Sequence, residues 1–333
     1  MTERGLRVAV IGFGKMGMLH AGILNVLPEV KLVAICEKNG LIRKFLKKAV
    51  NNVRVVDCVE KLSGLDLDAI YVTTPIASHF PVVKSLYEVG VARHFFVEKT
   101  LASNFKEANV LCDLARKSGG VNMVGYMRRF SVTFMKAKSL LNEGVIGKPV
   151  SFKAYAYSSD FFGVGGNSRV QTPRDGVVRD LGCHALDLAL WFFGDLRVED
   201  AKIVSFVNNG SMDSAHFSVK ASSGVAGEFS VSWCVDGYRM PEVGFMIEGS
   251  DGSLDVNDDE LEVSLKNGKR QRWFRHDLGE KVGFWLGSPE YYREDRRFVE
   301  AVFRGEPAEP CFETAAKVDR LIDEVLAKAG RIE

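Results

Sequence analysis

The segment "RDLGCHALDLALWFFG", residues 179–194, sets three polar side chains into an otherwise apolar run. Asp180, His184 and Asp187 follow the helical spacing i, i+4 and i+7, so a helix here would carry all three on one face. Because a buried polar group without a partner is costly, this face is paired internally, ligates a metal, or lines a site that handles protons. For proton transfer, His184 is the best base, and Asp180 one turn earlier would orient it and stabilise its charged form.

A second chemical signal is a G-x-G-x-x-G string formed by Gly12, Phe13, Gly14, Lys15, Met16 and Gly17. It follows a predicted strand and begins a predicted helix. The first glycine then permits a sharp turn, the second lets the backbone approach a pyrophosphate, and the third allows close helix packing. A glycine turn that serves packing only is the alternative, and the context favours a dinucleotide site.

Acidic and hydroxyl side chains at later strand ends extend this signal. Glu37 follows the strand-like "VKLVAIC" and could accept hydrogen bonds from an adenosine ribose, which favours NAD over NADP. Lys38 beside it could tolerate a 2′-phosphate, so NADP is also a possible cofactor. The alternative for Glu37 is that it is an ordinary solvent-exposed residue at a strand end. Further cofactor contacts are expected from Thr73, Thr74, Pro75 and His79, although a local cap is an equal alternative for His79.

Strand and helix patterns alternate through the first part of the chain. Strands are expected from residue 6 and at 30–36, 68–74, 93–99 and 121–126, with helices after the glycine string and at 41–50, 80–90 and 104–119. This alternation predicts a parallel, doubly wound sheet that ends near Tyr126. It defines a nucleotide-binding domain over residues 1–125.

The remainder, residues 126–333, is predicted to be a second domain for substrate binding and oligomerisation. A helix is expected at 131–143, a strand at 150–159, and further strands at 197–207, 215–222, 227–235, 243–250 and 261–274, the last as a hairpin around Asn267-Gly268. These short-turn strands indicate a largely antiparallel sheet. Two helices, at 289–304 and 312–329, complete the chain.

Composition sets the broad class. A chain of 333 residues suits two domains, and 44 basic against 43 acidic residues leave no global field for nucleic acid or an anionic membrane. No apolar run approaches a membrane span and no export segment precedes the first strand, so a cytoplasmic protein is expected. The six cysteines include no closely spaced pair. We therefore expect each to be a small buried hydrophobic side chain rather than part of a disulfide framework or a zinc ribbon.

With the glycine string, "TTPIASH", "VEKT" and "RDLGCHALD" in this order, the sequence resembles the glucose-fructose oxidoreductase, inositol dehydrogenase and rhizopine-catabolism family (Gfo/Idh/MocA) over nearly its whole length. The resemblance implies an α/β fold: an amino-terminal Rossmann doubly wound parallel sheet plus a carboxy-terminal α+β domain with a large, mostly antiparallel open sheet. It also implies a homodimer or homotetramer formed through that sheet.

The resemblance implies a reaction as well: hydride transfer between NAD(P) and a secondary hydroxyl or ketone of a sugar, cyclitol or sugar nucleotide. Lys99, after Glu98 at a strand end, looks like the family's catalytic lysine, and Asp180 and His184 look like its aspartate and histidine. Glu98 and Lys99 are also expected beside the cofactor. Thr100 stands where the family usually has proline, often after a cis peptide; because a non-proline cis bond costs about 2.5–4 kcal/mol, we expect a trans peptide or a strained one held by the site.

Substrate contacts are expected near the domain junction from Tyr126, Arg128, Arg179 and Asp187, with Arg129 and Arg174 as further guanidinium candidates. Guanidinium groups suit a carboxylate or phosphate, whereas ion pairs within the protein are the commoner fate of arginine. Asp180 and His184 have no accompanying cluster of ligands, so no metal is predicted. Residues 160–176 form either a lid or an ordinary connecting loop.

Two other functions compete with the dehydrogenase. One is glycosidic bond cleavage by transient oxidation with a retained cofactor, and the other is a non-catalytic dinucleotide-binding regulator. Retention of Lys99, Asp180 and His184 argues against the regulator, which needs no base. The basic hairpin "KNGKRQRWFR" is predicted to be a solvated strand pair, and neither nucleic acid nor membrane is an expected partner.

Overall fold

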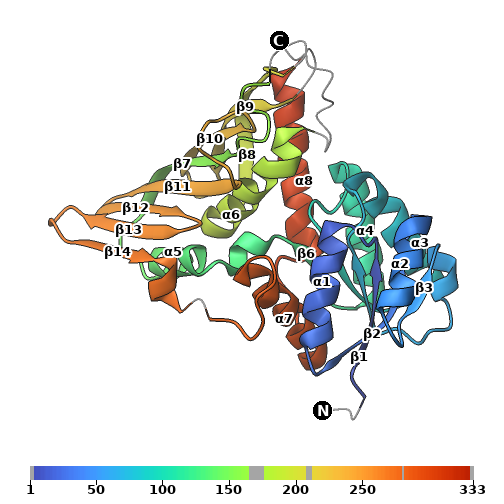
Figure 1. Cartoon of the computed structure of the whole chain (residues 1–333). Coiled ribbons are helices and arrows are strands. Elements are labelled where there is room, and N and C mark those ends of the chain that lie inside the picture. The colour runs from blue at the N-terminus through green and yellow to red at the C-terminus, as the bar shows by residue number, and fades with distance from the viewer. Residues whose placement is uncertain (1–3, 165–175, 208–211, 280, 331–333) are drawn as a thin grey trace. The chain divides into compact units, whose positions relative to one another are not determined.

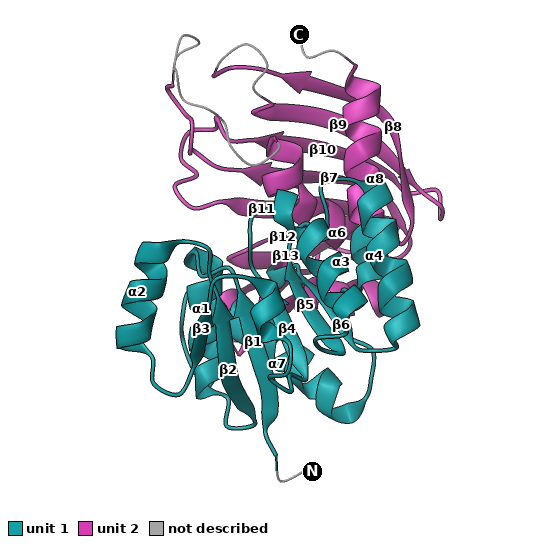
Figure 2. Ribbon diagram, turned by 90° about the vertical axis from the view of Figure 1, so that its right-hand side faces the viewer, with its two compact units in different colours: residues 1–127, 282–316 teal, residues 128–281, 317–333 magenta. Residues whose placement is uncertain are grey.

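A computed structural model describes residues 4–164, 176–207, 212–279 and 281–330. The chain forms two compact units (Figure 2): the first contains the residues up to Met127 together with Val282–Ala316, and the second contains Arg128–Lys281 and the residues from Lys317 onward. The first break lies close to the boundary expected at residue 125. Residues 282–316 were expected in the second domain and instead belong to the first unit, because their helix packs on its amino-terminal helix and last strand.

The first unit is built on a six-stranded sheet in the order β3-β2-β1-β4-β5-β6, and every neighbouring pair is parallel (Figure 1). Its strands are β1 (Leu6–Ile11), β2 (Val30–Cys36), β3 (Arg54–Val56), β4 (Ala69–Val72), β5 (His94–Glu98) and β6 (Asn122–Gly125). The near-continuous apolar runs are explained by burial on both faces. The predicted doubly wound sheet is therefore confirmed, although the three-residue β3 was too short for its pattern to predict.

Helices cover both faces of this sheet. They are α1 (Lys15–Val26), α2 (Gly40–Ala49), α3 (His79–Val89), α4 (Phe105–Ser118) and α7 (Pro289–Arg304). Helices α1 and α7 lie side by side on one face, and α3 and α4 pair on the other (Figure 1). Local signals fix their ends: the Asn104 side chain accepts a hydrogen bond from Glu107 N at the start of α4, and Gly119 ends that helix in the left-handed region.

The second unit contains an eight-stranded sheet in the order β14-β13-β12-β11-β7-β10-β9-β8. Its strands are β7 (Pro149–Tyr157), β8 (Leu196–Val204), β9 (Ser214–Ala221), β10 (Ala226–Ser232), β11 (Glu242–Gly249), β12 (Gly252–Asn257), β13 (Glu260–Leu265) and β14 (Arg270–Phe274). All neighbours are antiparallel except β7 and β10. The mostly antiparallel sheet is confirmed. Strand β12 was not predicted, because its start carries the turn residues of Ser250–Ser253.

One face of this sheet is apolar and packs on helices. The helices of this unit are α5 (Val132–Asn142), α6 (Cys183–Phe193) and most of α8 (Phe312–Ala329). Phe152 of β7 stacks on Phe193 of α6 with ring centroids 4.4 Å apart, while the alternate residues Lys153, Tyr155 and Tyr157 project to the opposite face. Within the described part of the chain, no helix is both long enough and apolar enough to cross a membrane.

Candidate active site

The first unit holds a cavity of 780 Å³ at the carboxyl ends of β1, β2 and β4. Strand order reverses between β1 and β4, and open α/β sheets bind ligands outside the strand ends at such a reversal. Nine predicted cofactor residues line the cavity: Gly12, Gly14, Lys15, Met16, Glu37, Lys38, Thr73, Thr74 and Pro75. The residues predicted from three separate motifs therefore meet around one space.

The glycine loop has the geometry that a pyrophosphate requires. Gly12 has a φ of +86°, which favours glycine, and its carbonyl oxygen accepts a 2.7 Å hydrogen bond from Thr73 Oγ1. Gly14 precedes the first turn of α1, and a Cβ added there would meet nothing within 4 Å. Backbone N–H groups at the start of α1 thus border open space, which is a ready site for an anion.

Glu37 is held in place by the backbone around the cavity. Its Oε2 accepts a 2.7 Å hydrogen bond from Phe13 N, and its Oε1 accepts one of 2.7 Å from Asn39 N. The guanidinium of Arg43 donates to the carbonyl oxygens of Glu37 and Lys38, at 2.8 and 2.5 Å. The carboxylate therefore has a fixed position at the end of β2, as recognition of a ribose hydroxyl requires.

Sequence reasoning missed part of the cavity wall. Its additional residues are Ile11, Cys36, Asn39, Ile42, Cys58, Val59, Glu60, Ser78, Pro81, Val82 and Ser85. The group from Ser78 to Ser85 follows helical spacing around the start of α3, a signal that could have been used. Cys58, Val59 and Glu60 come directly after β3, a strand that was not predicted. No local sequence signal therefore indicated that these three residues line the cavity.

His79 lies behind the cavity rather than in its wall. The side chain is fully buried, with Nδ1 2.7 Å from the carbonyl oxygen of Thr100 and Nε2 2.7 Å from that of Thr74. Burial lowers the pKa of His79. Because both ring nitrogens face backbone carbonyls, the expected dinucleotide contact gives way to a structural role that joins the loops after β4 and β5.

Lys99 directly follows β5, the strand beside β4. Its backbone N–H donates a 3.1 Å hydrogen bond to Glu98 Oε2. Its peptide bond to Thr100 is cis, so of the two forms expected from the sequence, trans or strained, the trans form is wrong. Thr100 is fully buried, and its hydroxyl donates to the carbonyl oxygen of Ala102 at 3.1 Å. Thr100 is thus held by its own hydroxyl and, through its carbonyl oxygen, by His79.

The second unit carries Asp180 and His184. Asp180 lies in a π-helical turn, Val178–Gly182, and His184 lies in the first turn of α6, with its Nδ1 buried. Such π-helical turns occur frequently at functional sites. Lys99 belongs to the first unit and these two residues to the second, so the expected meeting of Lys99 with His184 stays a prediction.

Asp187 does not join a substrate site. Its carboxylate receives two hydrogen bonds from Arg129, from Nε at 2.8 Å and from Nη2 at 2.7 Å, and its side chain is 1% exposed. The buried Asp187 carboxylate therefore pairs with the Arg129 side chain instead of making the substrate contact that was expected. Helical spacing placed Asp187 near the face of His184, but a buried guanidinium on another element decides its role.

The other proposed substrate residues are also buried in structural contacts. Arg128 donates to Asp258 and to the carbonyl oxygen of Pro241, and Arg179 pairs with Asp319 at 2.7 Å and Asp323 at 3.0 Å. Tyr126 is fully buried. Arg128 and Arg179 therefore already pair within the protein, and a substrate contact of Tyr126 stays a prediction.

Arg174 and most of the loop at 160–176, the candidate lid, lie outside the described residues. In the parts of the chain that are described, no group of three or more His, Cys, Asp or Glu side chains is arranged to hold a metal ion.

Comparison with known proteins matches this geometry. Residues 6–126 match the oxidoreductase family with the NAD-binding Rossmann fold, and residues 134–255 match the GFO/IDH/MocA C-terminal domain. The chain belongs to the GFO/IDH/MocA oxidoreductase family. Both the predicted family and the predicted NAD-binding domain are confirmed.

Individual relatives in this family are distant. The chain is 26% identical to scyllo-inositol 2-dehydrogenase (NAD(+)) of Bacillus subtilis over 69% of this chain and 68% of that one. It is 24% identical to myo-inositol 2-dehydrogenase of Thermotoga maritima over 91% and 90%. The solved structure of levoglucosan dehydrogenase in complex with NADH and L-sorbose superimposes with a TM-score of 0.86 at 20% identity, covering 98% and 97%, which shows that the fold is shared.

Proposed function

We propose that this protein is an NAD-dependent dehydrogenase that transfers hydride between nicotinamide and a secondary hydroxyl or ketone of a sugar, cyclitol or sugar nucleotide. The observation that carries this proposal is the cavity at the reversal of strand order, bordered by the open space at Gly14 and the fixed carboxylate of Glu37. Lys99 follows the next strand along the same edge of the sheet. The activities named for the inositol dehydrogenase relatives support the substrate class.

The described residues fit a dinucleotide. The N–H groups at the start of α1 would hold the pyrophosphate beside Gly14, and Glu37 would accept hydrogen bonds from the adenosine ribose. When bound, the nicotinamide supplies the hydride acceptor or donor. An acidic side chain at the ribose favours NAD, while Lys38 in the same wall leaves room for NADP.

In the proposed mechanism, His184 removes the proton of the substrate hydroxyl as its C–H bond gives up hydride. Asp180 orients the imidazole and stabilises its charged form. Lys99 donates a hydrogen bond to the reacting oxygen, so that negative charge developing there is stabilised. In the reverse direction, His184 returns the proton to the oxygen of the ketone. This division assigns nucleotide binding to the first domain and substrate binding to the second.

We also propose that the second unit forms a homodimer or homotetramer through the open face of its sheet. Tyr155, Tyr157 and Met246 project from this face, and Lys153 and Glu228 from neighbouring strands offer charges of both signs. Such a mixed apolar and charged face suits a second copy of itself. Light scattering of wild type and a Tyr157→Lys, Met246→Lys variant tests this, because like charges on both copies should dissociate the assembly.

A cytoplasmic location completes the proposal. All six cysteines are free, as expected in a reducing compartment. Cell fractionation with an antibody to the chain tests it.

The activity test uses the full chain with NAD and a panel of inositols, sugars and sugar nucleotides, followed by NADH absorbance. Lys99→Ala and His184→Ala should each lower kcat by at least about 100-fold, while Lys106→Ala, an exposed residue of α4, should not. Sugar release without net NADH would instead indicate glycosidic cleavage. NADH binding with no turnover of any compound would favour a regulator.

A further inference from the structure

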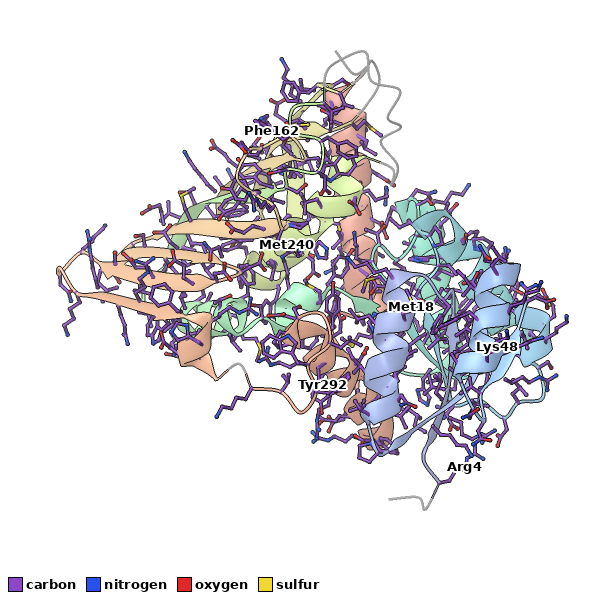
Figure 3. The ribbon with its side chains drawn as sticks, in the orientation of Figure 1. Arg4, Met18, Lys48, Phe162, Met240 and Tyr292 are labelled. Carbon is purple, nitrogen blue, oxygen red and sulfur yellow. The ribbon has the colours of Figure 1, made fainter. Side chains whose placement is uncertain are left out.

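A buried histidine links α1 to both β5 and α7 in the first unit. His20 is fully buried; its Nδ1 lies 2.8 and 3.0 Å from the two carboxylate oxygens of Asp295, and its Nε2 lies 2.8 Å from Glu98 Oε1. A carboxylate oxygen accepts hydrogen bonds, so a donor is needed at each ring nitrogen. When both carboxylates are ionised, each ring nitrogen must carry a hydrogen, and the ring is then an imidazolium. Figure 3 labels Met18 on α1 and Tyr292 on α7, the two helices that supply His20 and Asp295.

The surroundings of His20 favour this charged form. Burial lowers the pKa of His20, but Asp295 and Glu98 outweigh burial and raise its pKa well above the usual value. The Tyr71 ring from β4 lies 5.7 Å away and the Tyr291 ring from α7 lies 6.2 Å away. Burial raises the pKa of Tyr71, so at neutral pH its phenol adds no charge. The buried Glu294 beside Asp295 on α7 adds a further carboxyl group to this region.

Glu98 connects this network to Lys99. It is the last residue of β5, its Oε1 meets His20, and its Oε2 accepts the backbone N–H of Lys99 at 3.1 Å. Gly125 pairs with Glu98 across β6, and a Cβ on Gly125 would lie 3.2 Å from both Cδ and Oε1 of Glu98. The carboxylate is therefore confined on three sides: by an imidazolium, by a backbone amide and by the adjacent strand.

We propose that His20 is a positioning residue which, as an imidazolium held by Asp295, fixes the Glu98 carboxylate and thereby the backbone of Lys99. The ammonium of Lys99 is then aimed at the reacting oxygen. This inference rests on the proposed function, in which Lys99 contacts that oxygen. The carboxylate that contacts His20 Nε2 also accepts the backbone N–H of Lys99, so a change at His20 reaches Lys99 through one side chain.

The test compares His20→Asn with His94→Asn in the full chain. His94 lies in β5 as well, and its Nδ1 accepts a 3.0 Å hydrogen bond from Val121 N, so its loss perturbs the same strand far from Glu98. We expect His20→Asn to lower kcat by about 10- to 100-fold, because small misplacements of a catalytic group have such effects, while the Kd for NADH stays within about twofold. His94→Asn should lower Tm without this loss of kcat.

A double-mutant cycle tests whether His20 acts through Glu98. In a Glu98→Gln background, adding His20→Asn should change kcat by no more than about twofold, since the link is already broken. Multiplicative losses would overturn the proposal. If His20→Asn does not fold, Gly125→Ala takes its place, because it displaces the Glu98 carboxylate without changing any charge.

A second readout does not depend on activity. Acetic anhydride labelling of the apoprotein, followed by peptide mass spectrometry, gives the reactivity of Lys99 relative to Lys106. His20→Asn and Gly125→Ala should each change this ratio, and His94→Asn should not. An unchanged ratio together with unchanged kcat in folded variants would overturn the positioning role. If Lys99→Ala keeps full activity while the ratio still responds to His20→Asn, the catalytic role of Lys99 fails and the positioning of Lys99 by His20 stands.

Discussion

The Cα of Gly17 lies so close to the backbone of Gly12 that a methyl group at position 17 would overlap the carbonyl oxygen of Gly12 and lie 2.9 Å from Thr73 Oγ1. Gly14, two residues after Gly12, faces open space instead. Two positions of one motif thus favour glycine for different physical reasons. Gly17 is required by the protein's own packing, whereas Gly14 leaves open space at the start of α1, where we propose that the pyrophosphate binds.

This difference predicts opposite behaviour for Gly17→Ala and Gly14→Ala. Helix propensity alone would favour alanine at position 17 by about 1 kcal/mol, but overlap with backbone atoms should dominate and destabilise the protein by about 1–3 kcal/mol or more. Gly14→Ala should leave the free energy of unfolding within about 0.5 kcal/mol of wild type. It should nevertheless weaken NADH binding at least about tenfold, because the methyl group fills the pyrophosphate site.

Denaturant unfolding and NADH fluorescence titration of both variants check this prediction. Unimpaired NADH binding by Gly14→Ala would mean that the pyrophosphate does not approach the loop there.

Glu37 should determine the choice of cofactor. Glu37→Ala removes a carboxylate that Phe13 N and Asn39 N hold at 2.7 Å each, so NADH should bind about 10- to 100-fold more weakly, the scale of one lost hydrogen bond to a charged group. The preference for NADH over NADPH should narrow as well, because a negative charge facing the 2′-phosphate is gone. Parallel titrations of wild type and Glu37→Ala with NADH and NADPH measure both effects. Glu88→Gln, at an exposed position of α3, is the control.

The buried Arg129–Asp187 pair predicts a stability effect rather than a substrate effect. Asp187→Ala leaves an uncompensated guanidinium in the core of the second unit and should destabilise it by about 3–5 kcal/mol. The charge-free double variant Arg129→Met, Asp187→Leu should recover most of that loss. Urea unfolding gives the free energies. A large rise in KM for Asp187→Ala, measured at a temperature where it is folded, would argue for a substrate contact after all.

The pH dependence of stability should report the charge on His20. Its pKa, lowered by burial but raised further by Asp295 and Glu98, ends well above that of an unfolded histidine. Above about pH 6.5 the unfolded chain releases this proton while the folded chain keeps it. The stabilisation is therefore fully present below about pH 6.5 and is lost as pH rises towards the raised pKa, with a slope of up to about 1.4 kcal/mol per pH unit.

Urea unfolding between about pH 6.5 and 8 avoids the thiols, which titrate near pH 8.5 when unfolded. The double variant Glu98→Gln, Asp295→Asn lacks both carboxylates that raise the pKa of His20, so the downward slope should disappear. A wild-type slope of zero in this range would show that His20 is neutral in the folded protein.

Much of the first unit followed from local sequence signals. A strand, a glycine string, a helix and an acidic residue at the next strand end are close in the chain, and the topology of a parallel sheet brings such consecutive parts to one edge. For this reason most of the glycine string, Glu37 and the Thr73–Pro75 turn, all predicted as cofactor contacts, line one cavity. Short elements such as β3 have too few residues for a period to show.

The amino-acid sequence by itself determined the alternation of strands and helices, the family and the nucleotide site, because each rests on spacing within a few dozen residues. Only the tertiary structure decided the partners of the buried charges. His20 meets Glu98 and Asp295 from 78 and 275 residues away, and Arg179 meets Asp319 from 140 residues away. Ion pairing depends on the distance between side chains in space and on their burial. The periodic spacing of residues along the chain predicts neither.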